Sequence, residues 1–243
     1  MTQERLVIAD VIVRIIEGIC RDAEDGIVLL PQHVAPHIAF HDQAFVGAVQ
    51  QDVGLLAAIV QPDADAAVGA PQHLPQCLVG VAAALDAAPD ARCVILTSPT
   101  YEGVLSDIRT IAEICHARGV PLLVDEAHGA HYLPFAARYG WRGGAVAAGA
   151  DLVVQSAHKT LPSLTQTALL HWNSSFIPPQ ELERQLDVFE TSSPSYPLMA
   201  SLDGCTGLLA EHGDAWFAAW RARLQRFSGA VRPLRRLRVL CHG

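Results

Sequence analysis

Short apolar runs alternate with amphipathic stretches between residues 93 and 156, and this alternation constrains the fold more than any other feature of the chain. The runs 93–97, 120–124 and 152–155 are rich in Val, Ile and Leu, which predicts strands. The stretch 107–118 has apolar residues at helical spacing. Strands that alternate with helices are typical of a parallel sheet covered by helices, so the sequence predicts an α/β fold.

Each of these three strands ends in or next to a polar residue: Thr97, Asp125 and Ser156. In open α/β sheets, ligands bind just beyond the carboxyl ends of the parallel strands. We therefore expect the three strand ends to converge on one crevice.

The same patterns predict further elements on both sides of this segment, giving a mostly parallel sheet flanked by helices. Before it, we expect helices at 3–22, 41–53 and 74–86 and strands at 27–30 and 55–60. After it, we expect a strand at 166–172, helices at 178–190, 196–210 and 214–227, and a final strand without a partner at 237–243.

The composition excludes several classes of protein. With 51% hydrophobic and 17% charged residues the chain has enough apolar material for a substantial core. No apolar run reaches the roughly 18 residues of a membrane-spanning helix, and no signal-peptide pattern opens the chain. We therefore expect a soluble, cytoplasmic protein with no membrane partner.

The net charge and the cysteine spacing argue against further kinds of partner and bond. A net charge of -8 argues against nucleic acid as a partner, although the region 221–238 is rich in arginine. That region is interpreted as a solvated helix face, with a polyanion site as the alternative. The six cysteines form no C-x-x-C pair, so we expect neither disulfides nor zinc.

Lys159 is the only lysine among the 17 basic residues. A primary amine can lose its proton and form a Schiff base with a carbonyl, whereas the guanidinium of arginine cannot. Lys159 therefore either serves this chemistry or is a surface lysine that remained while the composition of the chain changed from lysine towards arginine.

The sequence PLLVDEAHGAH places Asp125 directly after a strand, followed by His128 and His131. The three side chains could bind zinc or iron, because carboxylate and imidazole suit both metals. Asp125 could instead pair with the protonated ring nitrogen of pyridoxal phosphate. A third possibility is that Asp125 and His128 only cap the next helix.

The sequence ADLVVQSAHKT places Ser156, His158 and Lys159 at the end of the next strand. A hydroxyl and an imidazole suit an anionic phosphate, and the neighbouring amine suits a Schiff base. S-x-H-K alone is a weak pattern. It becomes specific together with Asp125, because the two strand ends then serve both ends of one flat cofactor.

Four runs carry a resemblance to a known family: VILTSPTYEG, PLLVDEAHGAH, ADLVVQSAHKTLPSLTQ and TSSPSYPLMASLD. In order and spacing, over about residues 92–210, they resemble motifs of the Orn/Lys/Arg decarboxylase family. That family has the aspartate-aminotransferase-like fold (fold type I) of pyridoxal 5'-phosphate enzymes. The resemblance implies that Lys159 carries the cofactor as a Schiff base and that Asp125 pairs with its pyridine nitrogen.

The resemblance also implies roles for the neighbouring residues. Ala127 would pack on one face of the cofactor ring, and His128 would reach its phenolic oxygen. Ser156 and His158 would contact the phosphate. His41, in FHDQAF, resembles the histidine that stacks on the opposite ring face, although Ile38 stands where the family usually has arginine.

Two departures from the family pattern concern the flanks. The Gly/Ser/Thr-rich loop that the family places before the His41 stretch to hold the phosphate has no counterpart in this sequence. The small C-terminal domain also has none. We therefore expect residues 1–230 to form the cofactor-binding large domain, incomplete on its N-terminal side, and residues 231–243 to be a stub of the small domain.

The function that the resemblance implies is decarboxylation of arginine, lysine or ornithine to the corresponding amine and carbon dioxide. His41 or Lys159 would return the proton to the α-carbon. A homodimer or higher homo-oligomer is expected, and the segment 191–196 either reaches a partner's cofactor or is an ordinary loop. Alternatives are another fold type I reaction such as transamination, a remnant that folds or dimerises without turnover, and a metal-dependent hydrolase built on Asp125, His128 and His131.

Overall fold

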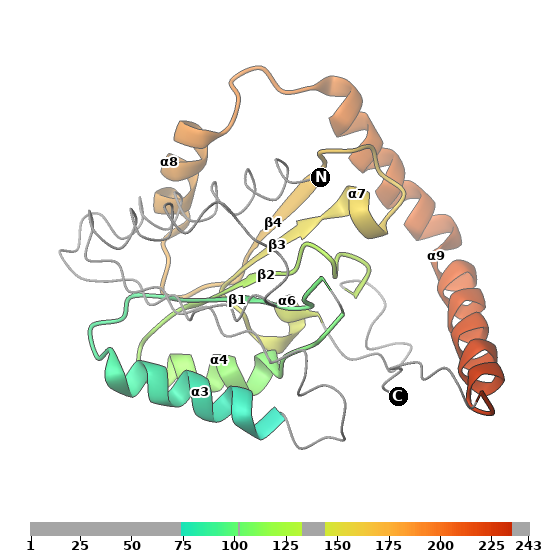
Figure 1. The fold of residues 1–243 in the computed structure, drawn as a ribbon. Helices are drawn as coiled ribbons and strands as arrows, with labels where there is room; N and C mark the ends of the chain where they lie inside the picture. The colour runs from blue at the N-terminus through green and yellow to red at the C-terminus, as the bar shows by residue number, and fades with distance from the viewer. Residues whose placement is uncertain (1–73, 102, 133–143, 235–243) are drawn as a thin grey trace, which may run out of the picture.

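The computed structural model of this protein describes residues 74–101, 103–132 and 144–234. Within them one sheet has four strands in sequential order, β1 (Val94–Thr97), β2 (Leu122–Asp125), β3 (Leu152–Ser156) and β4 (Ala168–Trp172) (Figure 1). β1, β2 and β3 are parallel, and β4 runs antiparallel to β3. The predicted α/β class with a mostly parallel sheet is confirmed. The elements predicted before residue 74 and after residue 234 lie outside the described residues.

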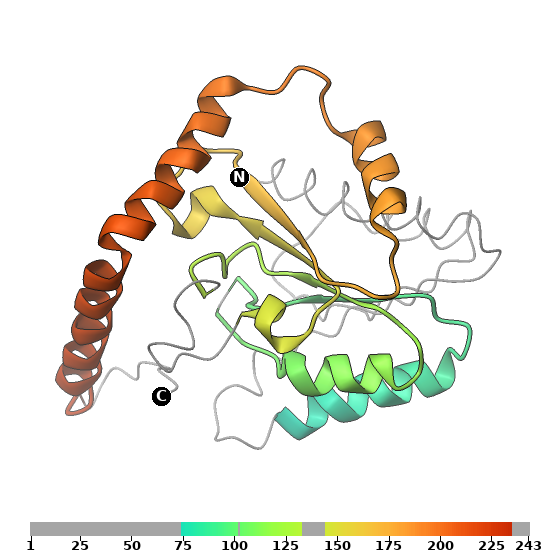
Figure 2. The same cartoon turned by 180° about the vertical axis from the view of Figure 1, so that it is seen from behind.

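Helices α3 (Leu74–Ala87), α4 (Ile108–His116) and α6 (Ala145–Ala148) cover one face of this sheet (Figures 1 and 2). They form the connections of a parallel sheet, because α4 joins β1 to β2 and α6 joins β2 to β3. The main apolar core lies between these helices and the sheet. It includes Val81 and Leu85 of α3, Ile111 and Cys115 of α4, and Leu96, Leu122, Val124 and Val153 of the strands.

The ends of α4 show why the chain forms a helix here. Asp107 caps the first turn, because its carboxylate accepts hydrogen bonds from the amide (3.2 Å) and the hydroxyl (2.9 Å) of Thr110. Apolar residues then recur on one face of the helix, which packs into the core. After the helix, Gly119 has a φ of 71°, a left-handed conformation that glycine adopts without strain.

In the part of the chain described up to residue 234, three helices follow β3: α7 (Ala157–Thr160), α8 (Pro179–Phe189) and α9 (Tyr196–Val231). The prediction of two helices at 196–210 and 214–227 is wrong, because α9 is continuous for 36 residues. The expected break contains Gly213, which costs a helix only about 1 kcal/mol relative to alanine. The helix continues through Gly213, which is buried against the rest of the protein.

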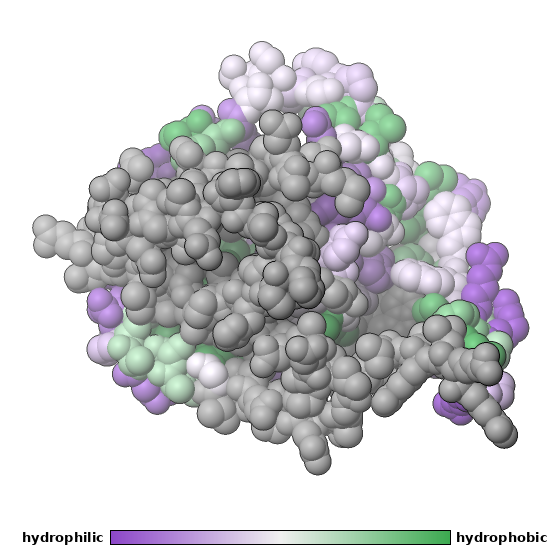
Figure 3. All heavy atoms as spheres, viewed as in Figure 1, coloured by the Kyte–Doolittle hydropathy of each residue, from purple (hydrophilic) through white to green (hydrophobic). Residues whose placement is uncertain are grey.

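Exposed apolar residues occur along much of α9, including Tyr196, Met199, Trp216, Leu224 and Phe227. Hydrophobic and hydrophilic side chains are interspersed along this helix (Figure 3). None of the described helices is both long and apolar enough to cross a membrane. Cys93, Cys115 and Cys205 are buried, and a buried thiol of this kind packs as a small apolar side chain.

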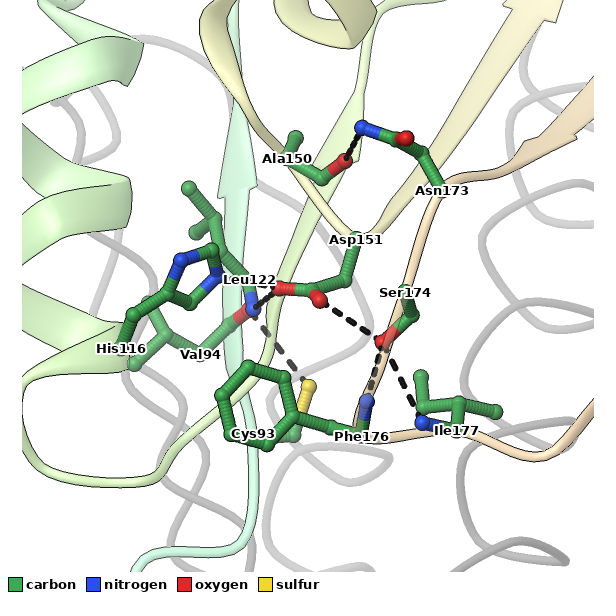
Figure 4. Close-up of polar contacts among 10 residues, drawn as sticks. All are labelled: Cys93, Val94, His116, Leu122, Ala150, Asp151, Asn173, Ser174, Phe176 and Ile177. Atoms are coloured by element: carbon green, nitrogen blue, oxygen red, sulfur yellow. Dashed lines mark hydrogen bonds and ion pairs between the residues drawn. The ribbon is translucent and has the colours of Figure 1, made fainter.

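A buried polar cluster fixes the amino ends of β2 and β3, on the side of the sheet remote from the carboxyl ends (Figure 4). At its centre the Asp151 carboxylate accepts hydrogen bonds from the Leu122 amide (2.8 Å), His116 Nε2 (2.7 Å) and Ser174 Oγ (2.7 Å). Ser174 Oγ in turn accepts from the amides of Phe176 (3.0 Å) and Ile177 (3.2 Å). The cluster therefore ties α4, β2, β3 and the chain after β4 to one carboxylate.

Candidate functional site

The carboxyl ends of β1, β2 and β3 lie side by side, as the sequence predicted. Thr97 pairs with Asp125, and Asp125 pairs with Val154, two residues before Ser156. Side chains alternate between the two faces of a strand. Asp125, Val154 and Ser156 therefore share the face of the sheet opposite to the helices α3 and α4.

The turn after β2 orients Asp125. This half-buried carboxylate accepts a hydrogen bond through Oδ1 from the amide of Ala127 (3.0 Å). The strand end thus supplies a carboxylate held by its own backbone, as a partner for a cationic ring nitrogen requires. Ala127 is itself buried beside it.

Glu126 holds this turn from the other face, a role that the sequence analysis missed. Its carboxylate is 1% exposed and accepts hydrogen bonds from the amides of Gly144 (3.1 Å) and Ala145 (2.9 Å) and from Gln155 Nε2 (2.6 Å). Burial raises the pKa of Glu126, and these hydrogen bonds oppose the rise. Gln155 Oε1 also accepts from His171 Nε2 (2.9 Å), so the network crosses β2, β3 and β4.

Gly129 allows this arrangement. A Cβ atom there would lie 2.5 Å from Glu126 Cγ, 2.9 Å from a ring carbon of Tyr132 and 3.0 Å from Pro99 Cδ. A side chain at position 129 would therefore displace Glu126. The signal in the sequence was the glycine within DEAHGAH, but its meaning depends on contacts that only the fold creates.

The short helix α7 starts directly after β3 and carries Lys159 on an exposed position. Ser156 ends the strand and is fully buried, and its Oγ has no hydrogen-bond partner among the described residues. A buried hydroxyl normally has a partner, because leaving it unsatisfied costs about 1–3 kcal/mol. This position therefore fits a hydroxyl that donates to a bound anion.

His158 is oriented by the loop that precedes β4. Its Nδ1 lies 2.9 Å from the carbonyl oxygen of Thr167, and since a carbonyl only accepts, Nδ1 carries the proton. The Nε2 atom is then the ring nitrogen that can meet a ligand. Thr167, which fixes this tautomer, is a further residue that the sequence analysis missed.

His128 lies on the turn after β2, and its ring meets the exposed ring of Tyr101 edge to face, with centroids 5.5 Å apart. Tyr101 belongs to the loop after β1, where Gly103 has a φ of 90°. The loops after β1 and β2 therefore meet at His128. His41, which the resemblance assigns to the cofactor's opposite face, lies outside the described residues.

His131 points to different neighbours. Its ring packs against Tyr132 (centroids 4.2 Å apart) and Trp220 of α9 (5.2 Å), and burial lowers its pKa to about 4. Within the described ranges, no three His, Cys, Asp or Glu side chains gather into a group that could hold a metal ion. The metal alternative built on Asp125, His128 and His131 therefore has no support from the geometry.

Comparisons with known proteins identify relatives of this chain. The family model described as Orn/Lys/Arg decarboxylase, major domain, matches residues 54–219. The uncharacterised protein YaaO of Bacillus subtilis is 47% identical over 146 residues, and an arginine decarboxylase of Halalkalibacterium halodurans is 35% identical over 165 residues. These matches cover 58% and 66% of this chain.

A solved structure shares the fold. The constitutive lysine decarboxylase of Escherichia coli superposes with a TM-score of 0.62 at 18% identity, over 92% of this chain and 32% of that one. The matches to YaaO and to the arginine decarboxylase cover 29% and 32% of those proteins. This chain thus spans about a third of the length of the curated relatives that it matches.

Proposed function

The chain belongs to the Orn/Lys/Arg decarboxylase family, and from this premise we propose that it binds pyridoxal phosphate through Lys159 and decarboxylates a basic amino acid. Arginine, lysine and ornithine are the candidate substrates. The bound cofactor would accept the electron pair that remains when the α-carboxylate leaves as carbon dioxide. Relatives named arginine and lysine decarboxylase support this reaction class.

One observation carries the proposal: the fully buried Ser156 hydroxyl, without a partner among the described residues, lies three positions before the only lysine of the chain. An ordinary structural serine at a strand end would be hydrogen-bonded. The phosphate of the cofactor would supply the missing acceptor, and His158 Nε2 would face the same group.

Asp125 serves the other end of the cofactor in this proposal. Its carboxylate would hold the proton on the pyridine nitrogen, because a neighbouring negative charge favours the cationic form. The hydrogen bond from Ala127 keeps the carboxylate in place before the ligand arrives. The buried methyl group of Ala127 would leave room for the flat ring.

The remaining parts of the site extend the proposal. His128 would donate to the cofactor's phenolic oxygen, and the contact with Tyr101 would hold its ring upright. We also propose that the functional form is a homodimer or higher homo-oligomer. The exposed segment 191–196, which leads from the loop after α8 into the first residue of α9, would then be available to a second copy.

Borohydride reduction tests the proposal. The full chain is incubated with pyridoxal phosphate, reduced, digested and analysed by mass spectrometry. We expect a phosphopyridoxyl group on the peptide that contains Lys159. In the Lys159→Arg variant, which keeps the positive charge, label should remain only at the N-terminal amine. Equal labelling of the 150–170 region in both proteins would disprove the assignment.

A further inference from the structure

A chain of hydroxyl groups connects α9 to the histidine of the candidate phosphate site. Ser201 of α9 lies with its Oγ 2.8 Å from Ser163 Oγ, in the loop between α7 and β4. Ser201 Oγ also accepts a hydrogen bond from the amide of Leu164 (2.7 Å). One side chain of α9 therefore holds this loop at two points.

The chain continues from the loop to Thr167. Thr167 Oγ1 lies 2.8 Å from both Ser163 Oγ and the carbonyl oxygen of Leu164, and it has a single proton to share between these two contacts. The carbonyl of the same Thr167 accepts the proton of His158 Nδ1. Three successive contacts thus lead from α9 to the imidazole ring. Figures 1 and 2 show α9 running past α7 and the loop before β4.

The inner end of this chain of hydroxyl groups is more deeply buried than the outer end. Thr167 is 2% exposed, whereas Ser163 and Ser201 are half-buried and Leu164 is exposed. The neighbouring Gln166 has a φ of 77°, so the backbone is held in an unusual conformation directly before Thr167. A tether from α9 is a physical means of keeping this strained turn in one position.

We propose that Ser201 is a positioning residue that sets the ring of His158 through Ser163 and Thr167. The position of α9 then determines how His158 presents Nε2 at the carboxyl end of β3. The proposed orientation of the His158 ring does not depend on a bound cofactor. Its consequence for phosphate binding rests on the proposed function.

The ring itself supplies a readout that does not need the cofactor. In the neutral side chain of free histidine the proton prefers Nε2, whereas the structure places it on Nδ1 of His158. Long-range ¹H–¹⁵N NMR of protein labelled with ¹⁵N-histidine distinguishes the two tautomers, and the His158→Asn variant identifies the signal. We expect the Nδ1–H pattern in the wild type without cofactor.

Ser201→Ala removes the tether and should fold, because alanine is a good helix former and the Leu164 amide can reach water. We expect the His158 signals to move away from the Nδ1–H pattern and the Leu164 amide to exchange faster. Ser201→Thr keeps a hydroxyl and should retain the wild-type pattern. Thr206→Ala is the matched control, since the exposed Thr206 hydroxyl donates to the Asp203 carbonyl within α9 itself (2.7 Å).

A pyridoxal phosphate titration of the same variants tests the consequence. We expect Ser201→Ala to weaken binding by roughly two- to tenfold, the worth of one net hydrogen bond. His158 signals that stay unchanged in Ser201→Ala, or that move equally in Thr206→Ala, would overturn the inference. If the ring moves while the cofactor affinity stays the same, the positioning is upheld and the assignment of His158 to the phosphate is lost.

Discussion

At the scale of single residues, each of the two strand ends combines a functional side chain with a main-chain group that orients it. The Asp125 carboxylate is held by the Ala127 amide and His158 by the Thr167 carbonyl. Both partners are main-chain atoms, so each contact depends on the side chains that hold the main chain of its turn. The site is therefore most vulnerable at Glu126 and Gly129, which shape the turn of Asp125, and at the hydroxyl groups of Thr167, Ser163 and Ser201, which hold the loop that orients His158.

Gly129→Ala should destabilise the protein and disturb the turn that carries Asp125. The added Cβ would lie 2.5 Å from Glu126 Cγ, and Glu126 is fixed by three hydrogen bonds. Overpacking of this kind costs about 1–3 kcal/mol. Denaturant unfolding measures the loss of stability, and pyridoxal phosphate titration measures the effect on the site.

Gly204→Ala is the matched control for that substitution. A Cβ at Gly204 would meet nothing within 4 Å, and the residue lies within α9. Alanine there should raise stability by about 0.5–1 kcal/mol, because it lowers the entropy cost of the helix. Equal stability changes of the same sign at both positions would contradict the contact argument.

The sequence predicted the residues at the strand ends but not the residues that hold them. Asp125 and Ser156 stand at the ends of short apolar runs and Lys159 stands three positions after Ser156, and such runs are visible in the sequence. Glu126 and Thr167 were missed, because their partners come from residues 9 to 29 positions away. A spacing pattern within one strand contains no information about such partners.

At the scale of the elements, the order of the core strands was predictable and the continuity of α9 was not. Parallel strands with helical connections follow from the alternation between residues 93 and 156. The predicted break at 211–213 contains Gly213, and glycine is a weak helix former. Tertiary packing decides such cases, and here Cys205, Gly213 and Phe217 are buried on one side of a single helix.

Asp151→Asn should destabilise the sheet by about 3 kcal/mol, near the upper end of the cost of unsatisfied buried polar groups. The Asp151 side chain is 2% exposed and accepts from the Leu122 amide, His116 and Ser174. The side chain of asparagine has an NH2 group in place of one carboxylate oxygen. This NH2 group would face one of the three donors, and two donors cannot form a hydrogen bond with each other. Urea unfolding at neutral pH measures the change.

Asp86→Asn makes the same chemical change in an exposed ion pair. Asp86 is 67% exposed and pairs with Arg118 at 2.8 Å. Exposed pairs contribute about 0–1 kcal/mol, so this control should leave stability nearly unchanged. A loss at Asp151 no larger than the loss at Asp86 would show that the buried cluster does not anchor the strands.

At the scale of the whole molecule, two buried groups limit the pH range of stability from opposite sides. Burial lowers the pKa of His131 to about 4 from 6.5 and raises the pKa of Glu126 above 4.5. Protonating His131 therefore favours the unfolded chain as the pH falls. Ionising Glu126 favours the unfolded chain as the pH rises through the raised pKa.

The predicted division of the whole chain into a large domain, residues 1–230, and a stub of the small domain, residues 231–243, stays a prediction.

The acid side of this range yields a prediction with a defined sign. Above pH 6.5 His131 is neutral in both states and has no effect, but below it the unfolded chain takes up the proton first. The stability contribution of the neutral ring should thus be lost between pH 6.5 and about 4, amounting to roughly 3–4 kcal/mol at ~1.4 kcal/mol per pKa unit. Thermal unfolding across this range measures it.

His131→Phe keeps an aromatic ring between Tyr132 and Trp220 and removes the titrating group. Its melting temperature should therefore fall less steeply below pH 6.5 than that of the wild type, because the unfolded state no longer gains a proton at this position. His212→Phe, a change to a side chain that is 44% exposed on α9, should keep the wild-type slope. Parallel curves for the wild type and His131→Phe would show that the acid limit is set by other groups.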